Sequence, residues 1–389
     1  MNFKTLRDFD LNGKTVLLRA DLNVPMQDGK VSDTTRIDRL KPTIDYLGTQ
    51  NCKVIILSHF GRPKGKENPE FSLSFLPPVL TKQWGINVDF GKEGSEKFTL
   101  LENLRFNAGE EANDIAYAKE LAALGDIFVN DAFSAAHRAH ASTESLAHLL
   151  PCAAGLLMEA ELNALSKALE APKKPVVAIV GGAKISTKLS VLNNLIQKVD
   201  TLILGGGMAN TFLYAMGVPV GLSLCEKDMA EEAKAISKKA ESLNCEIVLP
   251  TDRIAIREFK ENAAHEIIGL DSIAEDQETV DIGPETIKHI ESILDGAKTV
   301  LWNGPMGVFE MKPFDNGTNK VAQAVATRTK SGQLISVAGG GDTVSALDNA
   351  GVLNDFSYIS TAGGAFLEWI EGKELPGVVA LQKQAAKAA

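Results

Sequence analysis

Glycine clusters follow five short apolar runs in the second half of the chain. These runs with their glycines span residues 175–182, 201–207, 299–307, 334–341 and 358–364. Each run predicts a buried parallel strand followed by a tight turn into a helix. Glycine lacks Cβ, so backbone N–H groups at such a strand end can approach a phosphate closely. Ligands bind beyond the carboxyl ends of such strands. The pattern therefore predicts a site for a nucleotide or another large phosphorylated ligand.

The first half repeats this plan with cationic and polar strand ends. Its apolar runs lead into Arg, His, Asp and Asn within 15–23, 53–62, 99–106 and 127–133. The chain has ten arginines, and seven of them precede residue 139, namely Arg7, Arg19, Arg36, Arg39, Arg62, Arg105 and Arg138. Arginine forks match the oxygens of carboxylates and phosphates. We therefore expect a small, strongly anionic substrate in this half.

Several individual side chains at these strand ends allow two interpretations. Asp21 and Asn23 could hold substrate hydroxyls, or they could merely cap a turn. A single histidine is most often structural, yet three separate strand-end segments supply His or Arg. These segments are 19–25, 58–63 and 136–143, and the last two contribute His59, Arg62, His137, Arg138 and His140.

The segment 181–188 (GGAKISTK) predicts a helix start that carries two cations. Lys184 and Lys188 would lie one turn apart on one helical face. Cations at a helix N-terminus oppose the helix dipole, and a bound anion would relieve that conflict. The segment matches neither the P-loop pattern nor the dinucleotide fingerprint G-x-G-x-x-G.

Two further segments in the second half carry candidate ligands. In 338–348, Asp342 or Thr343 could be only a helix N-cap, or the glycine amides could hold a nucleotide phosphate with a metal on Asp342. The sequence leaves both open. Glu310 could accept hydrogen bonds from a ribose, although a lone surface glutamate is the commoner case.

The elements that must position these residues form two domains. A chain of 389 residues exceeds one ordinary core. Strands alternate with helical patterns, which predicts an α/β fold of two doubly wound parallel-sheet (Rossmann-like) domains. The boundary is expected near 171–175. Before it, Met158, Leu162, Leu165 and Leu169 share one face of a helix that could join the domains as a hinge.

Composition and charge exclude several functional classes. The net charge of −10 argues against nucleic-acid and membrane-surface partners. No signal region and no run of about 20 apolar residues is visible, so we expect a cytoplasmic protein. Cys52, Cys152, Cys225 and Cys245 fit no metal motif and are interpreted as thiols in a reducing compartment. No Ser-His-Asp nucleophile set is found.

Nine segments together resemble one known family, phosphoglycerate kinase, in its order. They are RADLNVP, SHFGRPKG, LLENLRF, NDAFSAAHRAH, VAIVGGAKISTK, LILGGGMANTF, LWNGPMGVFE, AGGGDT and YISTAGGAFLE, which cover about residues 15 to 370. Two positions depart from the common pattern: Ser134 stands where a glycine often follows DAF, and Ala362 stands where STGGG is usual.

The resemblance implies reversible phosphoryl transfer from 1,3-bisphosphoglycerate to ADP, giving 3-phosphoglycerate and ATP with Mg²⁺. It implies a phosphoglycerate-binding domain, 1–170 with 371–389, that includes the interdomain helix at about 158–169 and binds substrate through Asp21, Leu22, Asn23, Arg36, His59, Phe60, Gly61, Arg62, Arg105 and Arg138. It implies a nucleotide-binding domain, 171–370, that acts through Gly181, Gly182, Lys184, Lys188, Gly205, Asn303, Glu310, Gly340, Gly341, Asp342 and Thr343, with Asp342 as the metal ligand.

The same resemblance implies catalytic roles for Arg36, Lys184, Gly341 and Gly364, with Arg36 and Lys184 flanking the transferring phosphoryl. It also implies a monomer whose domains close around a hinge to bring the substrates together. Phosphoryl transfer needs alignment and charge stabilisation rather than a protein nucleophile. Two rival classes are a non-catalytic two-lobed binding protein and another ATP-dependent enzyme such as a ligase. Formation of ATP from bisphosphoglycerate and ADP separates all three.

Overall fold

The computed structural model describes residues 2–91 and 94–387, and the chain divides into two compact units. Unit 1 comprises Met1–Asn163 and Glu374–Ala389, and unit 2 comprises Ala164–Lys373. The division falls inside helix α6 (Leu156–Leu169), whose first half belongs to unit 1 and whose second half belongs to unit 2. The boundary expected from the sequence, near 171–175, lies just after the end of this helix, because the helical pattern is interrupted there.

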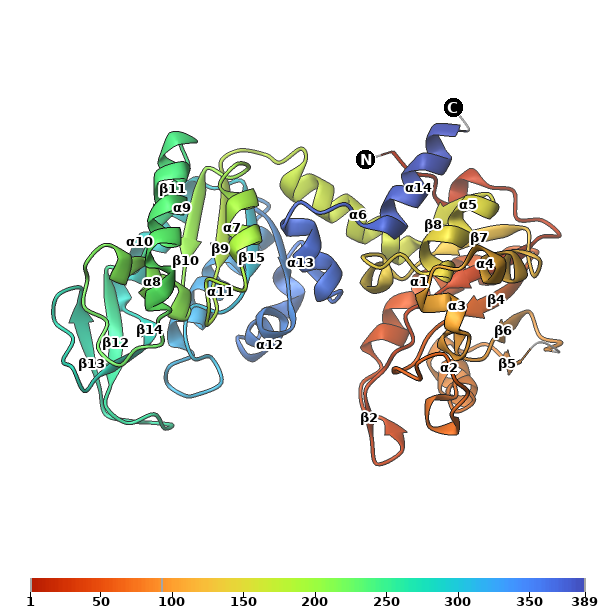
Figure 1. Ribbon diagram of the computed structural model, residues 1–389, viewed down its shortest axis with the longest axis horizontal. Coiled ribbons are helices and arrows are strands. Elements are labelled where there is room, and N and C mark those ends of the chain that lie inside the picture. The colour runs from red at the N-terminus through yellow and green to blue at the C-terminus, as the bar shows by residue number, and fades with distance from the viewer. Residues whose placement is uncertain (1, 92–93, 388–389) are drawn as a thin grey trace. The chain divides into compact units, whose positions relative to one another are not determined.

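A six-stranded parallel sheet forms the centre of unit 1 (Figure 1). Its order is β5 (Val88–Phe90), β6 (Phe98–Leu100), β4 (Lys53–Leu57), β1 (Thr15–Arg19), β7 (Ile127–Asn130) and β8 (Cys152–Ala154). Each predicted apolar run in this half supplies one of these strands. The chain extends the sheet from β1 through β4 first and returns to the other side of β1 with β7, so the strand order reverses at β1.

Helices and short turns connect these strands. The helices of unit 1 are α1 (Thr35–Thr49), α2 (Leu76–Trp84), α3 (Ala108–Glu111), α4 (Ile115–Ala122), α5 (Leu146–Leu149) and α14 (Pro376–Lys387), with single turns at Leu6–Asp8, Pro69–Phe71, Leu104–Phe106, Phe133–Ala135 and Ala141–Ser145. A hairpin of β2 (Met26–Gln27) and β3 (Lys30–Val31) precedes α1. The last helix, α14, packs on α5 and β8 of the same unit.

Unit 2 repeats the plan with a second six-stranded parallel sheet. Its order is β11 (Glu246–Val248), β10 (Thr201–Leu204), β9 (Val176–Val180), β15 (Thr299–Asn303), β16 (Ile335–Gly339) and β17 (Tyr358–Ser360). All five glycine-terminated runs supply strands of this sheet. The order reverses between β9 and β15, which lie side by side. Two doubly wound parallel sheets, as predicted, are therefore confirmed.

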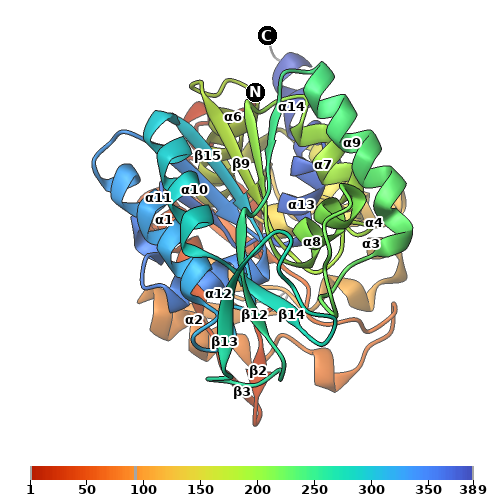
Figure 2. The same ribbon diagram turned by 90° about the vertical axis from the view of Figure 1, so that its left-hand side faces the viewer.

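Helices cover both faces of the second sheet. They are α7 (Leu189–Leu195), α8 (Gly206–Ala215), α9 (Ala230–Ser242), α10 (Pro284–Gly296), α11 (Asn316–Lys330), α12 (Gly341–Asn349) and α13 (Gly364–Ile370), with single turns at Lys227–Met229 and Leu353–Asp355. Figure 2 shows α10 and α11 on one side of β9 and β15, and α7 and α9 on the other.

Apolar periodicity accounts for the packing of each layer. In α1, Ile37, Leu40, Ile44 and Leu47 recur at helical spacing and are all fully buried in the core of unit 1. Burial of one such side chain stabilises the fold by roughly 1.5–3 kcal/mol. In unit 2, residues of α10 and α11 pack in the same way against β9 and β15.

A small antiparallel sheet in unit 2 was not predicted. Strands β12 (Asp252–Ile256), β13 (His265–Gly269) and β14 (Glu278–Ile282) pair in the order β13–β12–β14. The expectation of strands alternating with helices throughout is therefore wrong for this segment. Most of β13 is exposed, so its sequence lacks the apolar run that reveals the parallel strands.

Two negative findings concern the described residues 2–91 and 94–387. None of their helices is both long enough and apolar enough to cross a bilayer. The four cysteines are free thiols, and burial raises the pKa of each.

Candidate active site

Arg19 ends strand β1 at the point where the strand order of unit 1 reverses. Its register partners are Leu57 of β4 and Asn130 of β7. Crevices at such reversal points are where α/β sheets bind ligands. The side chain of Arg19 is 1% exposed. In the sequence this arginine is only one of the seven that precede residue 139, and no motif there assigns it to a site.

Buried polar groups hold the Arg19 guanidinium. Its Nε donates to Oγ of Ser142 over 2.9 Å, and its Nη1 donates to the carbonyl of Ala20 over 2.6 Å. The Ser142 hydroxyl donates in turn to Oε1 of the fully buried Glu110 over 2.6 Å. Because Ser142 and Glu110 lie about a hundred residues from Arg19 in the chain, no local motif signals this network.

The network ends at His59, and its contact with Arg19 determines which nitrogen of the imidazole ring carries the proton. Arg19 Nη2 lies 2.9 Å from His59 Nδ1. Arginine nitrogens are always donors, so Nδ1 must accept and the ring proton must reside on Nε2. Burial, followed by the positive charges of Arg19, Arg105 and Arg138, holds the pKa of His59 well below its ordinary value. His59 is therefore a neutral donor.

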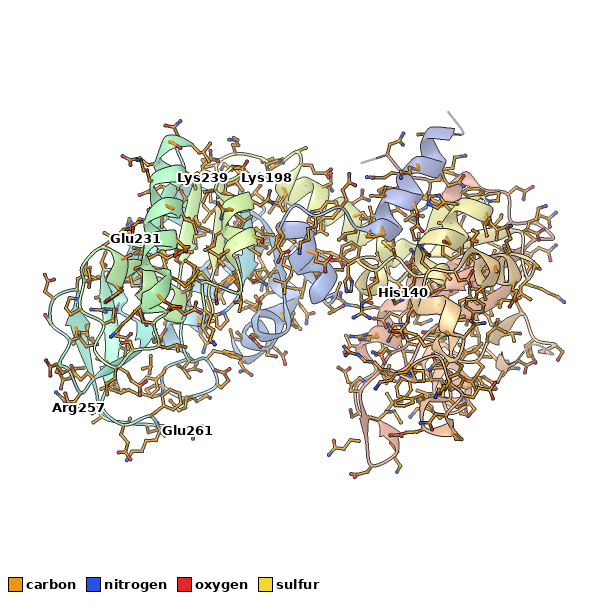
Figure 3. The ribbon with its side chains drawn as sticks, in the orientation of Figure 1. His140, Lys198, Glu231, Lys239, Arg257 and Glu261 are labelled. Carbon is orange, nitrogen blue, oxygen red and sulfur yellow. The ribbon has the colours of Figure 1, made fainter. Side chains whose placement is uncertain are left out.

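Arg105, Arg138 and His140 share this electrostatic environment. Arg105 is 4% exposed, and its Nη1 donates to the carbonyl of Gly61 over 2.7 Å. Arg138 Nε donates to Nε2 of His137 over 3.2 Å. Burial and then the charges of Arg105, Arg19 and Arg138 lower the pKa of His140, labelled in Figure 3, to about 4. The positive charge of the site therefore comes from arginine.

Asp21 and Asn23 tie this cationic cluster to the segment after β1. Asp21 Oδ2 accepts from Arg36 Nη1 over 2.5 Å, and Asp21 Oδ1 accepts from the backbone N–H of Asn23 over 3.2 Å. Asn23 Oδ1 accepts from the N–H of Gly61 over 3.0 Å. The polar groups therefore make turn contacts, as in the capping interpretation, while they also join two strand ends.

Contacts or mutual charge effects connect most of the predicted substrate residues. The connected set is Asp21, Asn23, Arg36, His59, Gly61, Arg105 and Arg138. The N–H of the buried Leu22 donates to the Ser58 hydroxyl over 3.0 Å, and Phe60 packs against Phe71 and Phe75. Arg62 is exposed, and no hydrogen bond or ion pair of its side chain is found among the described residues.

The reversal point of unit 2 lies where β9 and β15 end. Lys188 Nζ donates to the carbonyl of Gly181 over 2.6 Å and to that of Asn303 over 3.2 Å. A Cβ on Gly181 would lie 1.7 Å from the carbonyl oxygen of Pro305, so only glycine fits there. Burial lowers the pKa of Lys188 to about 8, and the negative charge of Asp342 partly opposes that shift.

The helix predicted to begin at Gly181–Lys188 starts later. Residues 181–188 form an irregular turn, Lys188 is the N-cap residue of α7, and the helix proper begins at Leu189. Lys184 is exposed within this turn, so the two lysines do not share a helical face. Of the candidate glycines here, Gly182 follows Gly181 in the turn and Gly205 is the N-cap of α8.

Helix α12 presents the second group of nucleotide candidates. Its N-cap is Gly340, with no side-chain cap and a φ of 100°. The alternative in which Asp342 or Thr343 caps this helix is therefore wrong. Thr343 Oγ1 instead accepts from the N–H of Gly304 over 2.7 Å, whereas Asp342 is exposed in the first turn with Gly341 before it.

A cavity of about 290 Å³ adjoins these elements in unit 2. Gly182, Glu310 and Asp342 line it, together with the neighbouring Gly206 and Pro305. Its remaining walls include apolar side chains such as Leu224 and Phe259. A small apolar pocket rimmed by glycine amides suits an aromatic base with attached phosphates. Gly364, the remaining candidate, is the first residue of α13.

Three kinds of comparison relate the chain to known proteins. The family model described as phosphoglycerate kinase matches residues 6–373. The phosphoglycerate kinase of Rhodospirillum centenum is 59% identical, with 98% of this chain and 100% of that relative covered, and that of Methylorubrum extorquens is 57% identical, with 98% and 99% covered. The solved structure of phosphoglycerate kinase from Coxiella burnetii matches with a TM-score of 0.94 at 44% identity, covering 99% of this chain and all of the other.

Proposed function

The chain belongs to the phosphoglycerate kinase family, and we propose that the cationic strand ends of unit 1 bind phosphoglycerate while the glycine-rich strand ends of unit 2 bind the nucleotide. The enzyme catalyses reversible phosphoryl transfer from 1,3-bisphosphoglycerate to ADP, a step of glycolysis. One observation supports this assignment of one ligand to each unit. The buried arginines and neutral histidines converge at the reversal point of one sheet, and the lysine and glycines converge at that of the other.

The substrate residues act by charge and alignment. Arg105 and Arg138, with Arg62 free to reach outward, would clamp the anionic groups of phosphoglycerate, and His59 would donate from Nε2. Asp21 would accept from the substrate's C2 hydroxyl, because an ionised carboxylate can only accept. In unit 2, Glu310 would accept from the ribose beside the apolar pocket.

Arg36 and Lys184 would stabilise the transferring phosphoryl group. Charge there increases along the reaction path, so cations placed around it lower the barrier without covalent chemistry. Backbone amides of Gly341 and Gly364, at the starts of α12 and α13, would supply further donors. No nucleophile from the protein is required.

Magnesium fits this site as a partner of the nucleotide. Asp342 offers an exposed carboxylate that caps nothing, beside the cavity that Gly182 and Glu310 line. Within residues 2–91 and 94–387, no three His, Cys, Asp or Glu side chains could together hold a metal. Mg²⁺ is commonly bound through one or two carboxylates plus substrate phosphates. Bound there by Asp342, it would neutralise phosphate charge.

Because we assign one reactant to each unit, transfer requires a state in which the reactants meet. We propose that hinge motion about α6 produces that state and excludes water from the acyl phosphate. Small-angle scattering tests this step: the radius of gyration should be smallest with 3-phosphoglycerate and nucleotide present together. A radius that is the same in all ligand states would contradict closure.

Amide hydrogen exchange tests the assignment of ligands to units. 3-Phosphoglycerate alone should protect the segments around Asp21, His59 and Arg105, and ATP with Mg²⁺ alone should protect those around Lys188 and Asp342. A coupled assay of ATP formation run on the same sample gives the activity. Protection of unit 2 by 3-phosphoglycerate alone would exchange the two roles.

We further propose a cytoplasmic monomer. The free thiols suit a reducing compartment, and each proposed site draws all its residues from one chain. Sedimentation at micromolar concentration should give a mass near 41.6 kDa, and a stable dimer would contradict this. Cell fractionation tests the location.

A further inference from the structure

Ser134 lies in the turn that follows β7 and contacts the proposed substrate site. Its Oγ hydroxyl donates a hydrogen bond to Oδ2 of Asp21, the same oxygen that accepts from Arg36 Nη1. The serine must be the donor, since an ionised carboxylate only accepts. Glycine, which often stands at this position in the family, has no side-chain donor.

The three hydrogen bonds to Asp21 differ in how well each donor is fixed. The N–H of Asn23 is part of the backbone, and Ser134 has one short side chain in the turn Phe133–Ala135. Arg36 has a long side chain that is 36% exposed, whereas that of Asp21 is 11% exposed. Of the two donors to Oδ2, the Ser134 hydroxyl therefore has less conformational freedom than the Arg36 guanidinium.

This arrangement has a consequence for catalysis. If Arg36 turns to the transferring phosphoryl, Oδ2 of the mostly buried Asp21 loses its charged partner. A buried carboxylate oxygen left without a donor destabilises the protein, because it has lost its hydrogen bonds to water and gained none in return. The Ser134 hydroxyl remains on Oδ2 and keeps the carboxylate oriented.

We propose that Ser134 is a positioning residue that holds Asp21 ready to accept from the C2 hydroxyl of phosphoglycerate, including when Arg36 leaves Asp21 for the phosphoryl. The inference rests on the proposed role of Asp21. A purely structural serine would stabilise the turn without affecting which substrate groups the enzyme recognises.

Recognition of one hydroxyl group gives the test. Calorimetric affinities are measured for 3-phosphoglycerate and for its analogue with hydrogen in place of the C2 hydroxyl. Ser134→Ala should weaken 3-phosphoglycerate binding by about 3–10-fold, the value of one hydrogen bond, and leave the analogue within twofold. Ser134→Thr, which keeps the hydroxyl, should bind both ligands like the parent.

Matched variants make the result specific. Ser145→Ala removes another hydroxyl of unit 1, one that reaches the carbonyl of Asn113 and not Asp21, and it should leave both affinities unchanged. Ser134→Gly repeats the loss of the hydroxyl in case Ser134→Ala folds poorly. Equal weakening of both ligands by the Ser134 variants, or no weakening, would overturn the proposal.

The variant Asp21→Asn distinguishes a wrong role for Ser134 from a wrong assignment of Asp21. If Asp21→Asn no longer binds 3-phosphoglycerate more tightly than the analogue without the C2 hydroxyl, the result supports the proposed site. If Asp21→Asn loses that preference while Ser134→Ala and Ser134→Gly keep it, only the role of Ser134 fails. If Asp21→Asn keeps it, the assignment of Asp21 fails, and the inference about Ser134 fails with it.

Discussion

Arg19 and His59 are joined by a hydrogen bond from Nη2 of the guanidinium to Nδ1 of the imidazole, 2.9 Å long. The arginine is itself fixed through the Ser142 hydroxyl to the buried Glu110. A buried cation thus selects one tautomer of the neighbouring ring, with the proton on Nε2. Neutral His59 then offers a donor to an anionic substrate without adding a further positive charge to the arginine cluster.

The pKa of His59 is lowered by burial first and by Arg19 next, so the ring of the free enzyme should stay neutral at pH 7 and throughout the range in which an ordinary histidine becomes protonated. Nitrogen-15 NMR should show the Nε2–H tautomer over this range. His59→Gln keeps a neutral donor and should raise the KM for 3-phosphoglycerate less than His59→Ala does. A protonated ring at pH 7 would contradict the assignment.

Arg36 and Arg62 should respond differently to removal. Arg62→Ala should mainly raise the KM for 3-phosphoglycerate, because a phosphate clamp acts similarly in the ground and transition states. Arg36→Ala should mainly lower kcat, by about 10²–10³-fold, because its charge is needed along the reaction path. Steady-state kinetics in both directions measures this.

Arg7→Ala is the matched control for the arginine pair. Arg7 is an exposed arginine of unit 1 that pairs with Glu159, and such surface pairs contribute about 0–1 kcal/mol. Its kinetics should match those of the parent. A kcat effect for Arg62 together with a KM effect for Arg36 would exchange their roles.

The parallel sheets were predictable because strands buried on both faces are continuous apolar runs. Val176–Val180 is buried at every position and is followed by glycine, so both the strand and its ligand-binding end follow from the sequence. Strand β13 has one buried residue among five. This strand pairs with β12, and the segment between the two strands carries no turn signal that would fix their antiparallel register.

Site residues also differ in how far the sequence alone could place them. Asp21 could be placed beside a strand end because it lies two residues after Arg19, the last residue of β1. The burial of Arg19 could not be inferred, because a buried guanidinium requires distant partners such as Glu110. The start of α7 was missed because 181–188 contains no helix-breaking residue after Gly182, yet Lys188 Nζ turns back to the Gly181 carbonyl.

Lys184→Ala should lower kcat by about 10²–10³-fold and change the KM for ATP by less than about threefold. Lys184 is exposed in the turn between β9 and α7, where it can reach a phosphoryl group. Lys198→Ala is the matched control, because Lys198, labelled in Figure 3, is exposed just before the amino end of β10, whereas Lys184 follows the carboxyl end of the parallel strand β9. Near-normal turnover of Lys184→Ala at saturating substrates would refute its role.

Asp342→Asn should separate metal binding from stability. Asp342 caps nothing in α12, so only its favourable interaction with the helix dipole, about 0.3–1 kcal/mol, is lost. The Mg²⁺ concentration for half-maximal activity should rise by about tenfold or more, because an amide is a poorer ligand for this hard cation. Asp348→Asn, at the exposed far end of the same helix, should change neither quantity. An Asp342→Asn enzyme that unfolds easily yet keeps its Mg²⁺ response would contradict the assignment.

Lys188 provides a prediction about protons. Burial lowers its pKa to about 8, so in the free enzyme at pH 8.5 most Lys188 side chains are neutral. A bound nucleotide adds negative charge nearby and raises that pKa, so binding at pH 8.5 should take up more than about half a proton. At pH 7 Lys188 is already charged, and this uptake should nearly vanish.

Calorimetry in two buffers of different ionisation enthalpy measures the proton uptake at each pH. Lys188→Met should abolish the difference between pH 8.5 and pH 7 that Lys188 causes, and Lys198→Ala should retain it. Protons exchanged by the nucleotide itself are common to all three proteins and cancel when they are compared. Equal uptake by Lys188→Met and the parent at pH 8.5 would mean that Lys188 does not face the nucleotide's charge, and the glycine-rich strand ends of β9 and β15 would lose their assigned ligand.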